Sequence, residues 1–136
     1  MPITEQELSQ ILAGQEFIQY YGVELYSLGD GEATIKIPFQ KKFERPGGVV
    51  NGPVFMAAAD LVVWLALFTK IDRAEAMMSV TTELNTAFLN GARGDFLCTG
   101  KILKLGKRLI YGTAESRSLE GKILSHHTVT YIRPYK

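Results

Sequence analysis

One aspartate lies inside the most apolar stretch of the chain. Between Pro53 and Phe68 the other fifteen residues are uncharged and almost wholly apolar, and Asp60 stands near the middle. Burying a carboxylate among apolar side chains costs several kcal/mol unless it is hydrogen-bonded or reaches a wet cleft. Asp60 could therefore be a structural residue that pairs with a threonine or a backbone donor. It could equally be a carboxylate held at a pocket as a general base or nucleophile.

The loop before this stretch could supply a second catalytic feature. Residues 46–52 read Pro-Gly-Gly-Val-Val-Asn-Gly and lead into the expected start of a helix. The first backbone N–H groups of a helix have no intrahelical partner, and the helix dipole places partial positive charge there. Such groups can polarise a carbonyl oxygen, as in an oxyanion hole. Ordinary helix capping by Asn51 explains the same residues without any chemistry.

The spacing along the helix limits how these two features can cooperate. Eight residues separate Gly52 from Asp60, which corresponds to about 12 Å of helix. The helix start and Asp60 of one copy are therefore not expected to meet at one reacting atom. A symmetric dimer could place Asp60 of one copy opposite the helix start of the other.

The rest of the chain predicts the elements that position these residues. Thr4 and Glu7 have the spacing of a capping box, which predicts a helix that begins near Glu5 and ends at Gly14, before a short turn at residues 16–20. Strands are expected over residues 23–28, 33–39, 78–89, 96–105, 109–119 and 122–133, with a loop over residues 41–50. In the strand over residues 78–89, we expect Val80, Thr82, Leu84, Thr86 and Phe88 to share one face.

These elements predict an α+β fold. The helix over residues 53–68 is apolar on nearly every side, as expected of a helix buried in a core. Short connections between the last strands make that part of the sheet antiparallel. The sequence therefore predicts an antiparallel sheet wrapped around one long central apolar helix.

Composition excludes several classes of protein. The chain has 136 residues, 46% of them hydrophobic, and a net charge of +1, which predicts one globular domain over residues 1–136 and argues against disorder and nucleic-acid binding. The single cysteine, Cys98, allows no intrachain disulfide or cysteine cluster, and His126 and His127 are adjacent and face opposite sides of a strand. We therefore expect no metal and no cofactor.

Nothing in the sequence predicts a membrane protein or an exported one. Sixteen apolar residues span about 24 Å, less than the ~30 Å of a hydrocarbon core. The polar, acidic segment over residues 1–14 does not resemble a signal peptide. A cytoplasmic location is expected.

Charge is distributed unevenly along the chain. Residues 1–90 hold 6 Lys and Arg against 11 Asp and Glu, a net charge of −5, whereas residues 91–136 hold 9 against 3, a net charge of +6. The basic second half could serve an anionic ligand. It could equally be a solvated sheet face that the acidic half balances.

The motifs as a set resemble a known family. The run Asn51-Gly52-Pro53, the aspartate at position 60 and the strand segment Thr81-Thr82-Glu83-Leu84-Asn85-Thr86-Ala87-Phe88-Leu89 are similar to the hotdog-fold acyl-CoA thioesterases, in particular to their phenylacetic-acid-degradation (PaaI-like) branch. The order of the expected helices and strands matches that of the family over nearly the whole chain. It implies that two subunits join their sheets edge to edge, often within a tetramer, with active sites at the interface.

The resemblance also implies roles for individual residues. Asp60 takes the place of the acidic residue that acts on the thioester carbonyl, and the Gly52 N–H takes the place of the oxyanion donor. Thr81 takes the place of the Ser or Thr that positions water or the acid, with Thr82 as the alternative if the register shifts by one residue. Asn51 stands where the family usually has histidine.

A basic group of residues resembles the family's site for the phosphates of coenzyme A. Lys107 and Arg108 lie between two expected strands, and Arg93 lies in the preceding turn region. Arginine and lysine suit phosphate by charge, and arginine also by bidentate geometry. Solvated strand ends explain each of these residues equally well.

The leading hypothesis is therefore an enzyme that hydrolyses acyl-CoA thioesters. Asn51 does not titrate, and Pro53, where the family has a second glycine, lacks a backbone donor. These departures favour, as an alternative, a hotdog module that binds an acyl-CoA or another acyl ligand without cleaving it. Dehydration of a 3-hydroxyacyl thioester is a third hypothesis, but the sequence shows no paired histidine and acid at a helix start.

Overall fold

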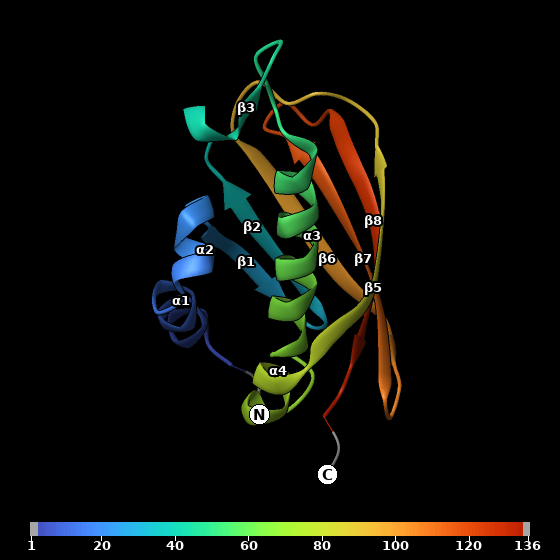
Figure 1. The fold of residues 1–136 in the computed structure, drawn as a ribbon. Coiled ribbons are helices and arrows are strands. Elements are labelled where there is room, and N and C mark those ends of the chain that lie inside the picture. The colour runs from blue at the N-terminus through green and yellow to red at the C-terminus, as the bar shows by residue number, and fades with distance from the viewer. Residues whose placement is uncertain (1–2, 135–136) are drawn as a thin grey trace.

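A computed structural model describes residues 3–134, which form four α-helices and a six-stranded antiparallel sheet (Figure 1). The α-helices are α1 (Glu5–Ala13), α2 (Glu16–Tyr21), α3 (Gly52–Leu67) and α4 (Arg73–Met78). The strands of the large sheet are β1 (Glu24–Gly29), β2 (Glu32–Ile37), β5 (Val80–Phe88), β6 (Phe96–Leu105), β7 (Leu109–Ser118) and β8 (Ile123–Ile132). They lie in the order β1-β2-β6-β7-β8-β5, so that β1 and β5 form the two edges.

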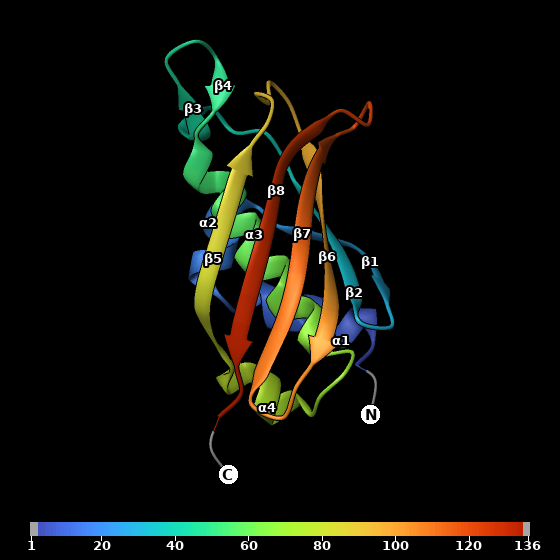
Figure 2. The same ribbon diagram turned by 90° about the vertical axis from the view of Figure 1, so that its right-hand side faces the viewer.

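The sheet curls around α3, which packs against its inner face (Figures 1 and 2). Nine of the sixteen residues of α3 are buried, as the all-round apolar sequence predicts. No helix within residues 3–134 has the length and apolar character needed to cross a membrane.

Two glycines let α3 approach the sheet closely. A Cβ atom on Gly100 of β6 would lie 2.8 Å from Cγ1 of Val62 and 3.1 Å from the backbone nitrogen of Val63. A Cβ atom on Gly112 of β7 would lie 3.1 Å from Cγ1 of Val63. At these two glycines the sheet has no side chain, so the helix backbone packs directly against the strands. This close packing sets the distance between Asp60 and the strands.

The N-terminal helix forms as its capping box predicts. Thr4 accepts a hydrogen bond from the backbone of Glu7 at 3.0 Å, and the Glu7 carboxylate accepts one from the backbone of Thr4 at 2.9 Å. The cap at Gly14 ends the helix where expected. Leu8 and Leu12 bury the inner side of this helix against the core.

Three features differ from the prediction. Residues 41–50 are not plain loop: they contain the 3₁₀ helix η1 (Lys41–Phe43) and the small ribbon of β3 (Glu44–Arg45) and β4 (Val49–Val50). The helix α4 occupies residues 73–78, so that β5 begins at Val80 instead of Met78. Six residues between a helix and a strand carry too weak a periodic pattern to predict a short helix.

The third difference is a bulge in β5. The register with β8 shifts between Thr81 and Glu83, which leaves Thr82 as the extra residue. The prediction that Val80 and Thr82 share a face with Leu84 and Thr86 was therefore wrong: Thr81 joins that inner face, whereas Val80 and Thr82 are exposed. The bulge decides which threonine meets α3.

Candidate active site

Asp60 lies in the wall of a pocket of about 440 Å³ between α3, α2 and the start of β5. Most of the lining is apolar and comes from Phe17, Ile18, Met56, Ala57, Leu61, Trp64, Val80 and Leu84. The Trp64 indole N–H donates a hydrogen bond to the carbonyl of Ala76 at 2.9 Å, which holds this ring in place. The pocket therefore presents one carboxylate on a largely apolar surface, as substrate sites commonly do.

Two hydroxyl groups hold one oxygen of this carboxylate. Thr81 of β5 donates to Oδ1 of Asp60 at 2.5 Å, and Tyr131 of β8 donates to the same oxygen at 2.8 Å. Tyr131 also lies 2.8 Å from the backbone carbonyl of Asp60. Within residues 3–134 no donor is found for the other carboxylate oxygen, Oδ2. Asp60 is thus anchored by Oδ1 and has Oδ2 available for chemistry.

The two candidate threonines are separated by the bulge in β5. Thr81 lines the pocket and contacts Asp60, whereas the Thr82 hydroxyl lies 3.3 Å from the carbonyl of Thr130 on an exposed surface. The structure therefore brings Thr81, and not Thr82, to the carboxylate.

The start of α3 lies at a second surface pocket, separate from the pocket that Asp60 lines. Gly52 lines a second pocket of about 480 Å³, together with Val50, Phe55 and Phe88. The Phe88 ring covers Gly52 so closely that a Cβ atom there would lie 3.0 Å from the ring. Asp60 does not line this second pocket. One copy of the chain therefore does not bring Gly52 and Asp60 together, as the helical spacing predicts.

Asn51 is the N-cap residue of α3 by position only. Its side chain makes no capping hydrogen bond, whereas its backbone N–H donates to the carbonyl of Phe43 at 2.8 Å and its carbonyl accepts from Val54 at 3.1 Å. Capping by the Asn51 side chain is thus not observed. The backbone bonds of Asn51 fix the loop at the start of α3.

The basic residues lie at opposite ends of the sheet. Arg93 belongs to the connection before β6, near the start of α3, and donates to the carbonyl of Gly47 at 2.8 Å. Lys107 and Arg108 belong to the turn after β6, near α4 (Figure 2). The ten residues of β6 separate the two groups, a distance of about 30 Å. One copy does not bring them together.

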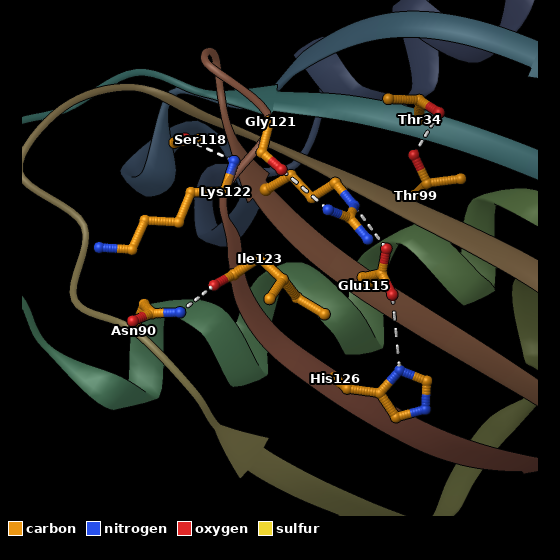
Figure 3. Close-up of polar contacts among 10 residues, drawn as sticks. Thr34, Asn90, Thr99, Glu115, Ser118, Gly121, Lys122, Ile123 and His126 are labelled. Carbon is orange, nitrogen blue, oxygen red and sulfur yellow. Dashed lines mark hydrogen bonds and ion pairs between the residues drawn. The ribbon is translucent and has the colours of Figure 1, made fainter.

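The adjacent histidines face opposite sides of β8, as predicted. His126 lies on the outer face of the sheet, with Nδ1 3.9 Å from the Glu115 carboxylate (Figure 3). His127 is buried on the inner face between the hydroxyl groups of Thr86 and Ser125, each at 2.8 Å. Burial, with a smaller contribution from His126, lowers the pKa of His127 to about 4, so that the ring is neutral at pH 7.

No metal site is evident in the described part of the chain. Within residues 3–134 no three His, Cys, Asp or Glu side chains converge in the manner of metal ligands. Cys98 is fully buried on β6, as expected of a small apolar residue, and burial raises the pKa of its thiol to about 12.

Comparison with known proteins places this arrangement in a family. The family model described as the thioesterase superfamily matches residues 47–125, which include Gly52, Asp60, the strands β5 to β7 and the start of β8. The chain belongs to the thioesterase superfamily. It is 34% identical over 109 residues to SSO2140 of Saccharolobus solfataricus, which is provisionally named an esterase, and the match covers 79% of this chain and 76% of that protein.

Two solved structures share the fold of this chain. The thioesterase HI1161 of Haemophilus influenzae superposes with a TM-score of 0.89 at 19% identity, over 98% of this chain and 92% of that one. The PaaI protein of Escherichia coli, from the phenylacetic acid degradation operon, superposes with a TM-score of 0.82 at 13% identity, over 96% and 92%. The predicted hotdog fold and the resemblance to thioesterases are thus confirmed.

One residue that contacts Asp60 in this thioesterase-superfamily chain was not predicted. Tyr131 lies 71 residues after Asp60 and near the end of the last strand. The alternation of buried residues along β8 would place it on the inner face. Its contact with Asp60 depends on the position of α3 over the sheet, which the sequence does not specify.

Proposed function

We propose that this protein hydrolyses the thioester bond of an acyl-CoA, with Asp60 as nucleophile or general base. The observation that carries the proposal is the Asp60 carboxylate, which two hydroxyls hold at Oδ1 while Oδ2 has no donor among the described residues. Asp60 is only partly buried and lines the pocket, and within residues 3–134 its Oδ2 is not among the buried polar atoms that lack a partner, so water or a substrate can reach this oxygen. Membership of the thioesterase superfamily supports the same reaction class.

The chemistry needs a base and a group that stabilises negative charge. As a general base, Oδ2 would take a proton from water while the water oxygen attacks the thioester carbonyl carbon. The carbon–sulfur bond then breaks, and the leaving thiolate takes up the proton. As a nucleophile, Oδ2 would attack the carbonyl carbon itself, the carbon–sulfur bond would break to release the CoA thiolate, and water would then hydrolyse the resulting anhydride to the free acid and restore the Asp60 carboxylate. In both routes the carbonyl oxygen becomes negatively charged, and the Gly52 N–H would donate to it.

Because Asp60 and Gly52 lie apart in one chain, the proposal includes a dimer. The edge strand β5 begins at Val80, beside the Asp60 pocket, and ends at Phe88, beside Gly52. In an antiparallel pair of β5 strands from two copies, the start of each strand lies next to the end of the other. This pairing would bring Asp60 of one copy towards Gly52 of the second copy.

The β5 edge has the surface that such a pairing needs. Val80 is 58% exposed, Phe88 56% and Leu89 48%, although all three are large and apolar. An edge strand also presents unpaired backbone groups that a second strand can satisfy. A homodimer through this edge would cover the apolar side chains and join the sheets of the two subunits into one continuous sheet. A homotetramer would need a second interface.

The same pairing bears on the binding of coenzyme A. Arg93 lies at the Gly52 end of its own sheet, whereas Lys107 and Arg108 lie at the other end. In an antiparallel pair, Arg93 of one copy and Lys107 of the second copy would lie at the same end of the dimer. We propose that these basic residues bind the CoA phosphates there.

Complementation between two inactive variants tests the shared site. Asp60→Asn removes the base, and Gly52→Pro removes the backbone N–H at the first helical position, where the backbone accepts proline. The added ring requires the Phe88 side chain, 3.0 Å from the new Cβ atom, to move, so circular dichroism is used to check that each variant folds. Each variant alone should be inactive. In an equal mixture refolded together, about half of the dimers pair one chain of each kind and hold one intact site, so about one quarter of the parent activity should return. No recovery in such mixed dimers would contradict the shared site.

A binding module without turnover is the second candidate, because Asn51 replaces the family's histidine and cannot transfer a proton. It predicts that calorimetry detects binding of an acyl-CoA while the thioester stays intact. Thioester cleavage that depends on Asp60 would exclude it.

A further inference from the structure

We propose that Tyr131 is a positioning residue that fixes the Asp60 carboxylate so that Oδ2, and not Oδ1, is the oxygen that reacts. The inference rests on the proposed function of Asp60 in thioester hydrolysis. It adds a residue from β8, near the end of the described chain, to a site otherwise built from α2, α3 and the start of β5.

The position of the Tyr131 hydroxyl carries the argument. It lies 2.8 Å from both Oδ1 and the backbone carbonyl oxygen of Asp60. These two acceptors belong to the side chain and the main chain of the same residue. The single hydroxyl proton is shared between these two acceptors, so the hydroxyl holds the carboxylate oxygen close to the helix backbone and restricts rotation about the bonds of the Asp60 side chain.

Thr81 completes this restraint from the neighbouring strand. Thr81 and Tyr131 are register partners on β5 and β8, and both hydroxyls bind Oδ1. Rotation of the carboxylate by half a turn would exchange Oδ1 and Oδ2 at the hydroxyls, but intermediate angles would lengthen and weaken both bonds. The carboxylate is held in one plane, and the oxygen without a donor is the one left to take a proton or attack a carbonyl carbon.

Tyr131 is itself held rigidly. Its side chain is only 4% exposed, and β8 lies between β7 and β5 in the sheet. Two residues later, Arg133 forms an ion pair with Glu75 at 2.8 Å and donates to the carbonyl of Gly106 at 2.9 Å. Burial raises the pKa of the Tyr131 phenol well above its ordinary value, so the hydroxyl keeps its proton and remains a donor.

The alternative interpretation is that the Tyr131 hydroxyl only supplies a hydrogen bond to a partly buried carboxylate. On that interpretation its loss lowers stability and leaves turnover per folded molecule unchanged. A positioning role instead requires that loss of the hydroxyl slows the chemical step, because a small displacement of a catalytic group can cost about 100-fold in rate.

The test is Tyr131→Phe, which removes the hydroxyl and keeps the ring. We expect kcat to fall by about 10- to 100-fold while KM stays within about twofold, because the hydroxyl is already hydrogen-bonded to Asp60 and the ring that lines the pocket is retained. Tyr111→Phe is the matched control: Tyr111 lies on the outer side of β7, is 40% exposed and should retain the parent kcat. Circular dichroism and thermal unfolding give the folded fraction to which each kcat is normalised.

Tyr131→Met, which fills the space with a flexible apolar side chain and lacks a donor, gives a second measurement if the Phe variant folds poorly. Both variants should lose kcat to a similar degree. A parent kcat in a folded variant, or a loss confined to KM, would overturn the positioning role and leave the proposed function standing. A parent enzyme that cleaves no acyl-CoA would overturn the proposed function and this inference with it.

Discussion

Buried His127 predicts that the protein loses stability in mildly acidic solution. Its ring lies between the hydroxyls of Thr86 and Ser125, and burial lowers its pKa from 6.5 to about 4. In the unfolded chain the ring takes up a proton as the pH falls through about 6.5, whereas the folded chain resists protonation until about pH 4. The unfolded state therefore binds more protons in this window, and stability falls with pH.

The expected size of the effect follows from these two pKa values. A pKa difference of one corresponds to about 1.4 kcal/mol of stability. Above about pH 7 the free energy of unfolding is not reduced by protonation of His127. It is expected to be about 2 kcal/mol lower at pH 5 and about 3 kcal/mol lower at pH 4. A loss of this size is a large fraction of the 5–15 kcal/mol or so that a typical domain has.

Urea unfolding followed by circular dichroism, at half-unit steps from pH 7.5 to pH 5, measures this change. Most carboxylates remain ionised over this range, so histidine dominates the slope. His127→Gln should flatten the dependence, because the amide can replace both hydrogen bonds and does not titrate. His126→Gln is the control and should retain most of the slope, since His126 is exposed. The same unfolding free energy at pH 7.5 and pH 5, or an unchanged slope in His127→Gln, would refute the reasoning.

Three further predictions address packing, the cysteine and assembly. Gly100→Ala should lower the free energy of unfolding, measured by urea titration, by about 1–3 kcal/mol, since the new Cβ atom would lie 2.8 Å from Val62. Gly94→Ala is the control: the space around Gly94 is open, so the free energy of unfolding should change little. Cys98 should not react with a thiol reagent until the protein unfolds, because it is fully buried; rapid labelling of the native protein would contradict its placement. Sedimentation equilibrium at micromolar concentration should give a dimer or tetramer, and Val80→Lys should weaken it; a stable monomer of the parent would exclude the shared site.

Local signals in the sequence account for most of the fold. The capping box at Thr4 and Glu7 and the all-round apolar segment that contains Asp60 each predicted an element that the structure contains. Such signals act over a few residues, so they can be read without knowledge of the tertiary contacts. The separation of Asp60 from Gly52 was predictable for the same reason, since it depends only on the rise of a helix.

The remainder depends on contacts between distant segments. The choice between Thr81 and Thr82 is made by a bulge in β5, and a bulge depends on how β5 pairs with β8. Tyr131 reaches Asp60 only because Gly100 and Gly112 let α3 lie close to the sheet. Neither contact has a local sequence pattern, so both required the structure.

The measurement that tests the central claim most directly is release of free CoA from short, medium, long-chain and aromatic acyl-CoAs, with Asp60→Asn beside the parent. The account predicts turnover by the parent and at least about a 100-fold loss in Asp60→Asn, the contribution expected of a positioned base. Asp72→Asn is the matched control, because the Asp72 side chain is exposed and makes no capping hydrogen bond. Turnover by Asp60→Asn at the parent rate would contradict the assignment of Asp60 as the catalytic carboxylate.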